Sequence, residues 1–169
     1  PKLERPEHLW CETMISAQTG PAFWNAVSHV NPLSVGLNCS LGPDLMYPFL
    51  SELSEAASSA ISCYPNAGLP NPLAATGFDL EPADMGRYLG DFGKAGLLNV
   101  AGGCCGNTPE HIAAIAKALE DVPPRPLPSS VPVARPESVP EISSFRPLRL
   151  SGSQPFTQQE GVYMIIGER

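Results

Sequence analysis

Three short apolar segments, each followed by a helical stretch, constrain the fold of this chain more than any other feature of its sequence. In each helical stretch the apolar residues recur at spacings of three and four, which indicates one buried helix face. Short strands that alternate with amphipathic helices imply parallel βα units. The expected strands are residues 33–37, 60–64 and 97–101, and the expected helices are residues 45–58, a stretch beginning at Pro82, and residues 108–119.

The signals at the helix starts support this interpretation. Pro82 suits the first turn of its helix, where a missing N–H costs nothing. Thr108 is a good N-cap, Pro109 suits the first helical position, and Glu110 lies near the positive end of the helix. Upstream, residues 22–27 read as the end of an earlier helix. The α/β repeat suits either a (β/α)8 barrel or a doubly wound sheet, and repetition alone does not choose between them.

Three cysteines follow the ends of two of the expected strands. Cys39 comes directly after the first strand, and Cys104 and Cys105 come after the third. The carboxyl ends of parallel strands lie on one face of a barrel, so these three sulfurs are expected to meet there. Three thiolates at about 2.3 Å suit Zn²⁺, and an open fourth position is typical of a catalytic zinc site. Three inert, buried thiols are the alternative.

The glycines around the cysteine pair support a tight loop. Gly102 and Gly103 allow a sharp turn and a close backbone approach, and Gly106 can adopt a backbone conformation that other residues avoid. The loop opens a helix, whose N-terminal amides favour thiolates. Asn66, after the middle strand, is expected to face the same pocket, where its side-chain oxygen would bind the metal or the substrate. Its alternative role is that of a turn former.

The remaining candidate ligands are expected to be ordinary residues. Cys63 lies inside a strand and Cys11 near the N-terminus, so neither is assigned a role. His8, His29 and His111 have no partner at ligand spacing, and His111 is expected to be solvated or to cap its helix.

Charge and composition exclude several classes of partner. The net charge is −7 without a basic run, which argues against nucleic acid. Since no apolar stretch approaches about 20 residues, no membrane span is expected. The odd number of cysteines, five, indicates a reducing compartment, and we expect a cytoplasmic protein.

The composition changes after the third βα unit. Eight prolines fall within residues 122–147, so an extended linker is expected over 122–160. Residues 161–169 look like the first strand of another domain, cut short. The chain begins at Pro1 and ends soon after an apolar run, so we expect a segment of a longer protein in which residues 1–121 form the βα part.

Three segments carry a resemblance to a known family. Residues 36–39 (GLNC), 64–70 (YPNAGLP) and 102–106 (GGCCG) resemble the signature segments of the zinc-dependent homocysteine methyltransferases, in the same order and at similar spacing. The resemblance covers roughly residues 16–120. It implies a TIM barrel of which this chain supplies the last three or so βα units. It also implies that Cys39, Cys104 and Cys105 hold Zn²⁺, which activates the thiol of homocysteine.

The linker and residues 165–169 further resemble one branch of that family, the cobalamin-dependent methionine synthases. This implies methylcobalamin as the methyl donor, with cobalamin and methyltetrahydrofolate bound by other modules of the parent chain. The implied partners are homocysteine, the other half of the same barrel, and the folate and cobalamin domains. Because half of the barrel is missing, the chain alone is expected to show little or no turnover.

Three rival interpretations remain open from the sequence. A homocysteine methyltransferase using betaine or S-methylmethionine would share the βα part and end after its barrel. A metal-free barrel would use the glycine-rich turn as a phosphate-binding loop. A non-catalytic remnant would have no independent fold.

Overall fold

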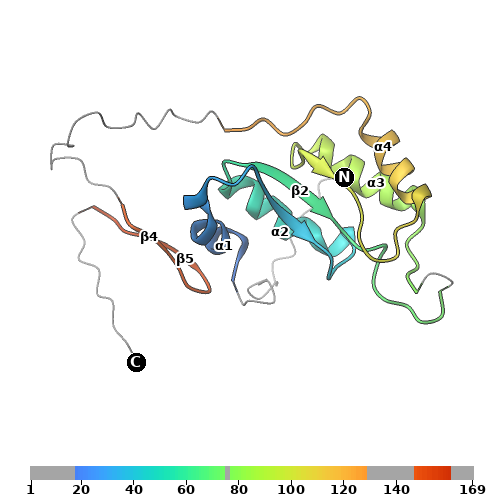
Figure 1. Cartoon of the computed structure of the whole chain (residues 1–169), viewed down its shortest axis with the longest axis horizontal. Helices are drawn as coiled ribbons and strands as arrows, with labels where there is room; N and C mark the ends of the chain where they lie inside the picture. The colour runs from blue at the N-terminus through green and yellow to red at the C-terminus, as the bar shows by residue number, and fades with distance from the viewer. Residues whose placement is uncertain (1–17, 75–76, 129–146, 161–169) are drawn as a thin grey trace.

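The computed structural model describes residues 18–74, 77–128 and 147–160 of the chain. Its centre is a three-stranded parallel sheet in the order β1-β2-β3, with helices packed against it (Figure 1). The alternation of strand and helix predicted from the sequence is therefore confirmed, whereas closure into a barrel stays a prediction. The strands are β1 (Ser34–Asn38), β2 (Ala60–Tyr64) and β3 (Val100–Ala101), and the helices are α1 (Gly20–Val27), the 3-10 turn η1 (Ser28–Val30), α2 (Pro43–Ala56), α3 (Pro82–Lys94) and α4 (Pro109–Leu119).

The core lies between the sheet and the helices α2 and α3. Successive strand residues point to opposite faces of a sheet, and Val35, Ile61 and Cys63 are the strand residues that join the buried cluster. They pack with apolar residues of α2 and α3, whose inward positions were predicted from their spacing. The core residues of these two helices are Met46, Leu50 and Leu53 of α2 and Met85, Leu89 and Phe92 of α3.

The helices begin at or near the residues that the sequence signals predict, whereas the third strand is shorter than predicted. α3 begins at Pro82 and α4 at Pro109, as predicted, while α2 begins at Pro43, two residues before the expected start. β3 is shorter than expected, and Asn99, directly before it, bonds to Ile61 twice, first through its backbone N–H, which donates to the Ile61 carbonyl at 2.9 Å. The side-chain Oδ1 of Asn99 accepts the N–H of Ile61 at 2.9 Å, in place of a backbone carbonyl.

The start of the expected linker is fixed to the body of the protein. Arg125 is buried, its backbone N–H donates to Leu98, and its carbonyl accepts the side-chain amide of Asn99. Its guanidinium donates to the carbonyls at the end of α2, namely those of Ser54, Ala57 and Ser59. The structure therefore differs here from an extended linker, because proline does not prevent a neighbouring arginine from docking.

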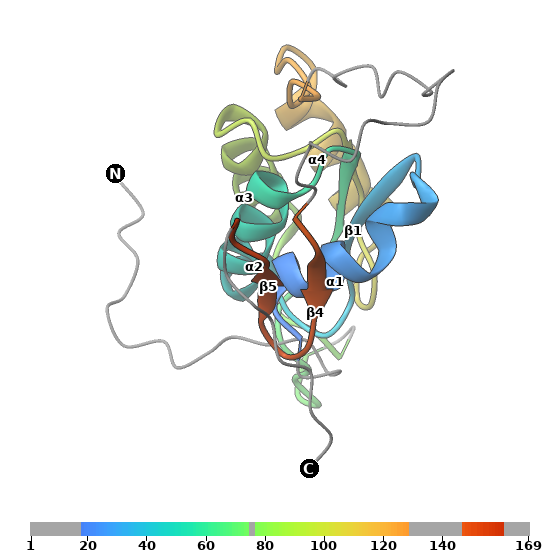
Figure 2. The same cartoon turned by 90° about the vertical axis from the view of Figure 1, so that its left-hand side faces the viewer.

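The structure differs again at the far end of that segment. Residues 149–157 form an antiparallel hairpin of β4 (Arg149–Ser151) and β5 (Pro155–Thr157) that packs beside α1 (Figure 2). The N–H of Thr19 donates to Ser153 at 3.0 Å, and the hydroxyl of Ser151 donates to Ala22 at 2.6 Å. Residues 129–146 of the expected linker lie outside the described residues, as do the strand expected at 161–169 and residues 1–17, which include His8 and Cys11.

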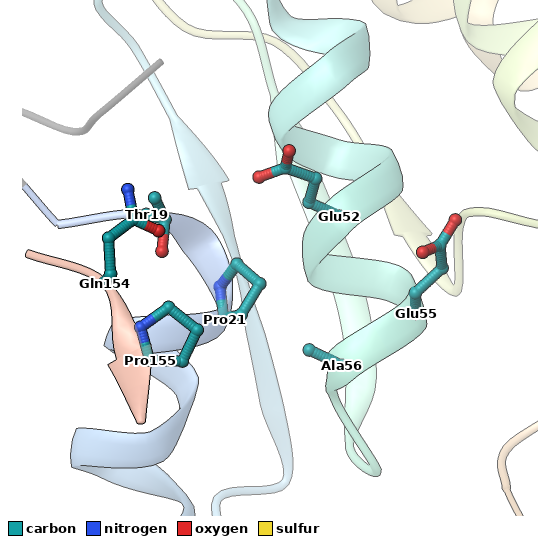
Figure 3. Close-up of a pocket in the computed structure, with 7 residues that line it drawn as sticks. All are labelled: Thr19, Pro21, Glu52, Glu55, Ala56, Gln154 and Pro155. Carbon is teal, nitrogen blue, oxygen red and sulfur yellow. The ribbon is translucent and has the colours of Figure 1, made fainter. Parts of the chain in front are cut away.

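A shallow groove of about 400 Å³ is lined by residues of the hairpin, of the start of α1 and of α2 (Figure 3). Glu52 and Glu55 project from α2 at this groove. No cysteine lines it, so it is separate from the cysteine loops. Within the described ranges, none of the helices has the length and apolar character needed to cross a membrane.

Candidate metal centre

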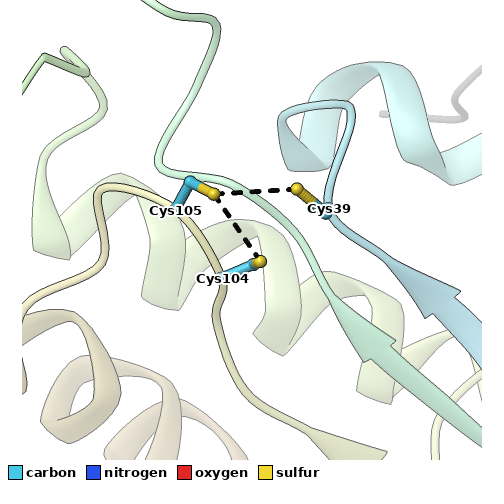
Figure 4. A group of neighbouring side chains, drawn as sticks. All are labelled: Cys39, Cys104 and Cys105. Atoms are coloured by element: carbon cyan, nitrogen blue, oxygen red, sulfur yellow. Dashed lines mark hydrogen bonds between the residues drawn. The ribbon is translucent and has the colours of Figure 1, made fainter.

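The structure brings together the three sulfurs that the sequence places after the strand ends (Figure 4). The Sγ of Cys39 lies 3.7 Å from that of Cys105, which lies 3.8 Å from that of Cys104. All three atoms lie within 4.8 Å of one another. These distances are too long for a disulfide, and the three cysteines are free thiols.

Cys39 reaches the cluster through an unusual turn after β1. Cys39 and Ser40 have φ values of 66° and 67°, a left-handed conformation that is uncommon outside glycine. The turn closes with a hydrogen bond from the N–H of Leu41 to the carbonyl of Cys39 at 2.8 Å. Such backbone strain of about 1–3 kcal/mol per residue persists where the surroundings determine the conformation, and it is often found at functional sites.

Cys104 and Cys105 are held by the continuation of β2. The N–H of Cys104 donates to Pro65 at 2.9 Å, and the N–H of Ala67 donates to Cys105 at 2.9 Å. Before them, the N–H of Gly102 donates to Cys63 at 3.1 Å. The loop after β3 is therefore paired with residues 63–67 as if the parallel ladder continued past the strand.

Residues 63–67 hold the other cysteine loop as well. The N–H of Cys39 donates to Tyr64 at 2.9 Å, and the N–H of Asn66 donates to Leu41 at 3.0 Å. The end of the middle strand thus lies between the two loops and bonds to both. This shared template explains why sulfurs separated by 65 residues of sequence meet at one point.

Asn66 lies beside the cluster, as predicted, and has a specific contact there. It is only 4% exposed, and its Oδ1 accepts the N–H of Cys105 at 3.2 Å. The sequence left this oxygen free for a metal or a substrate, whereas in the structure it orients the Cys105 peptide. Its side chain also interacts with the Cys39 thiol.

The thiols of the cluster differ in acidity. The backbone N–H of Ser40, followed by the side chains of Cys104 and Cys105, lowers the pKa of Cys39. The neighbouring Cys39 and Cys104 raise the pKa of Cys105 to about 11. Cys39 is thus the thiol that ionises most readily. Its negative charge opposes ionisation of the neighbouring thiols unless a cation is bound.

The donor set fits a zinc ion. Four ligands at about 2.3 Å in a tetrahedron place neighbouring sulfurs about 3.8 Å apart, and the Sγ of Cys105 lies 3.7 and 3.8 Å from the other two. Thiolates are soft ligands that favour zinc over harder cations. In the described part of the chain, the histidine, cysteine and carboxylate atoms close enough to share one ion belong to these three cysteines alone. Cys105 is exposed, so the cluster is open to solvent on one side.

Cys63 takes no part in the cluster, as expected. It is fully buried, its sulfur lies 3.3 Å from that of Met46, and burial raises its pKa to about 12. A thiol in this environment is not a nucleophile at neutral pH.

Sequence reasoning missed Asn107 and only partly described His111. Asn107 binds the carbonyls of the cysteine loop, and its only sequence signal is its place between Gly106 and the N-cap Thr108. His111 is 5% exposed, so the solvated alternative is wrong and the capping alternative is confirmed. Its Nδ1 accepts the N–H of Thr108 at 3.1 Å, and its Nε2 lies 2.8 Å from the carbonyl of Leu80.

A comparison with protein families agrees with this geometry. The family described as homocysteine S-methyltransferase matches residues 7–119, about two thirds of the chain. The matched range contains all three clustered cysteines and Asn66, and it ends at the last residue of α4. The chain belongs to the homocysteine S-methyltransferase family.

Proposed function

We propose that Cys39, Cys104 and Cys105 bind one Zn²⁺ and that this site holds the thiol of homocysteine for methylation, which forms methionine. The observation that carries the proposal is the spacing of the sulfurs: the Sγ of Cys105 lies 3.7 and 3.8 Å from those of Cys39 and Cys104, as expected for thiolates around a single tetrahedral ion, and all three lie within 4.8 Å of one another. Family membership supports methyl transfer to homocysteine as the reaction. The proposal also assigns a substrate contact to Asn66, whose side chain lies beside the cluster and accepts the N–H of Cys105.

The chain's own residues would prepare this site in three ways. Residues 63–67 hold both cysteine loops, so the three sulfurs are in place before a ligand arrives. The Ser40 N–H favours a thiolate at Cys39. Cys105 lies at the exposed side, where a substrate sulfur can approach. When bound, zinc supplies the positive charge that keeps the substrate thiol ionised at neutral pH, where a free thiol with a pKa near 8.5 is mostly protonated.

We further propose that the parent protein is a cytoplasmic, cobalamin-dependent methionine synthase. The proline-rich segment and the terminal residues 165–169 support this branch of the family, in which methylcobalamin is the donor. Cobalamin and methyltetrahydrofolate would then bind other modules of the same parent chain, which makes its folate and cobalamin domains partners of this segment.

The open sheet supports a further partner, the other half of the barrel. Among the described residues β1 and β3 each pair on one side only, with β2. Unpaired strand edges are normally covered or paired, so additional βα units would complete the sheet. The TIM barrel expected from the sequence would arise in this way.

Elemental analysis of the purified chain and its variants tests the metal site. We expect about one zinc per chain, and loss of most of it when Cys39, Cys104 or Cys105 is replaced by serine, because two thiolates bind zinc much more weakly than three. Cys63→Ala is the matched control and should keep its zinc, since that sulfur lies in the core. A chain without zinc, or one that keeps zinc after all three replacements, would contradict the proposal and favour the metal-free phosphate-binding barrel.

Reconstitution with the missing barrel half tests the reaction. Mixing the two halves with homocysteine, zinc and methylcobalamin should yield methionine, and a chelator should abolish the product. Parallel assays with betaine and with S-methylmethionine identify the donor. Methionine formed only with one of those two donors would overturn the cobalamin assignment while leaving the zinc site intact.

A further inference from the structure

Asn107 lies directly after the glycine-rich loop, one residue before the N-cap of α4, and its side chain is the centre of the loop's hydrogen bonds. Its Nδ2 donates to the carbonyl of Pro65 at 3.0 Å. The same group lies 3.4 Å from the carbonyl of Cys104 and 3.5 Å from that of Cys105. One side-chain amide thus lies within hydrogen-bonding distance of three carbonyls, those of Cys104, Cys105 and Pro65.

The carboxamide of Asn107 is held tightly from its other side. It packs so closely on Gly103 that a Cβ at that position would collide with it. Its Oδ1 is buried without a hydrogen-bond partner among the described residues. A buried acceptor without a hydrogen bond is unfavourable. The hydrogen bonds that the NH₂ group donates to the carbonyls must therefore keep the side chain in this orientation.

The side-chain bonds of Asn107 add to a frame around the cysteine pair, in which the carbonyl of Cys104 also accepts the N–H of Asn107 at 3.3 Å and that of Cys105 accepts the N–H of Ala67 at 2.9 Å. Pro65 accepts from both the N–H of Cys104 and the Nδ2 of Asn107, and Asn66 accepts the N–H of Cys105. The backbone N–H and C=O of Cys104 and of Cys105 are therefore all hydrogen-bonded. Since the direction of each Cβ follows from the orientation of its peptide groups, this frame determines where the two sulfurs point.

We propose that Asn107 is a positioning residue of the metal site: its side-chain amide ties the Cys104 and Cys105 carbonyls to Pro65 and thereby sets the spacing of their sulfurs. This inference rests on the proposed function, because it applies to metal binding by the three cysteines. Asn107 would not touch the ion or the substrate. It would act through the loop, as outer hydrogen-bond partners of metal ligands generally do.

The test uses the full chain with Asn107→Asp and Asn107→Ala. The aspartate keeps the shape but presents acceptor oxygens to three carbonyls, and the alanine removes the contacts without adding repulsion. Zinc affinity is measured by competition with a chromophoric chelator, and the ligand arrangement by the absorption spectrum of the chain saturated with Co²⁺. We expect affinity to fall about 10- to 100-fold, as for other outer-shell changes, with a shifted cobalt spectrum. Asn107→Ser, which keeps one donor, should recover part of the affinity.

Asn25→Asp is the matched control. Asn25 also donates through Nδ2 to a carbonyl, that of Leu150 at 3.5 Å, and its Oδ1 is likewise buried without a partner among the described residues. It lies in α1 beside the hairpin, so this variant should keep the wild-type zinc affinity and cobalt spectrum.

The outcomes separate the inference from the proposed function. A wild-type chain that binds neither metal overturns the proposed function. If the wild type binds zinc and the Asn107 variants match it in affinity and spectrum, the positioning role is wrong. An equal loss in Asn25→Asp would also overturn it, because the effect would then reflect general loosening. Circular dichroism identifies any variant that fails to fold. If Asn107→Asp does not fold, the zinc affinities and cobalt spectra of Asn107→Ala and Asn107→Ser test the positioning role.

Discussion

Cys39 and Cys105 have different acidities although their sulfurs lie 3.7 Å apart. The difference arises from what each sulfur faces. Cys39 interacts with the N–H of Ser40, which stabilises its thiolate, whereas Cys105 interacts mainly with the other two thiols. Within a cluster of like groups, the residue with a backbone donor ionises first, and its charge then opposes ionisation of its neighbours.

This difference predicts an order of modification in the metal-free chain. Thiolates react with iodoacetamide and thiols do not, so Cys39 should be alkylated at a lower pH than Cys105, whose pKa is about 11. Cys63 should stay unmodified while the chain is folded, because it is buried and its pKa is about 12. Peptide mass spectrometry across pH 6 to 10 would measure the order, with the unfolded chain as the control. Alkylation of Cys105 before Cys39 would contradict the assigned acidities.

At the scale of elements, short polar contacts join the ends of helices to the rest of the protein. His111 connects the start of α4 to the carbonyl of Leu80, and Arg125 closes the end of α2. The final carbonyls of a helix lack intrahelical partners and carry partial negative charge. The buried guanidinium of Arg125 donates to two carbonyls there, those of Ser54 and Ala57, and to that of Ser59 just beyond the helix. Arg125 belongs to a segment that the composition assigns to a linker.

Replacing Arg125 should therefore destabilise the protein. Arg125→Ala leaves the carbonyls of Ser54 and Ala57 without their buried donor, and the free energy of unfolding should fall by about 3 kcal/mol. Arg125→Lys should lose less, since an ammonium can still donate to these carbonyls. Urea denaturation followed by circular dichroism would measure both variants.

The matched control for this experiment is Arg87→Ala. Arg87 forms an exposed ion pair with Asp84 at 3.3 Å, a contact that contributes little to stability. Its guanidinium also lies 4.3 Å from the centroid of the Tyr88 ring, so the free energy of unfolding should fall only slightly, by much less than in Arg125→Ala. If Arg125→Ala unfolds at the same urea concentration as Arg87→Ala, then Arg125 does not stabilise the end of α2.

At the scale of the whole molecule, the last part of the described region packs against its first helix. After residues 129–146 the β4–β5 hairpin packs beside α1, so the two ends of the described region lie side by side (Figures 1 and 2). The hairpin supplies a carbonyl to Thr19, the N-cap of α1, whose N–H has no partner within the helix. The contact therefore links the end of the described region to the first helix of the βα part.

Ending the chain at residue 146 should expose this amide. Without the carbonyl of Ser153, the N–H of Thr19 should exchange with solvent at least about tenfold faster, as expected where a local hydrogen bond is lost. The amide of Ile61 in the central strand, which bonds to Asn99, should be unaffected. Hydrogen exchange resolved by residue would measure both. Unchanged exchange at Thr19 would show that the hairpin does not dock on α1 in solution.

The sequence by itself determined the features that depend on neighbouring residues. The short apolar run located β2, and the proline and capping residues located the starts of α3 and α4. These signals work because they depend only on residues that are adjacent in the sequence. The same reasoning placed Cys39 and the Cys104–Cys105 pair at strand ends and Cys63 inside a strand. The carboxyl ends of parallel strands lie at the same edge of a sheet. The positions of the three cysteines in the sequence were therefore enough to predict that their sulfurs converge.

Only the tertiary structure decided which polar groups form hydrogen bonds with one another across long separations. The Asn66 oxygen binds the Cys105 N–H rather than remaining free, and Asn107 joins the cysteine loop to Pro65. Arg125 docks on α2, and the hairpin docks on α1, within a segment whose prolines predict an extended chain. These contacts join residues 39 to 129 positions apart, and a buried polar group binds whatever partner the packing brings within 3 Å or so. Local pattern carries no information about that partner.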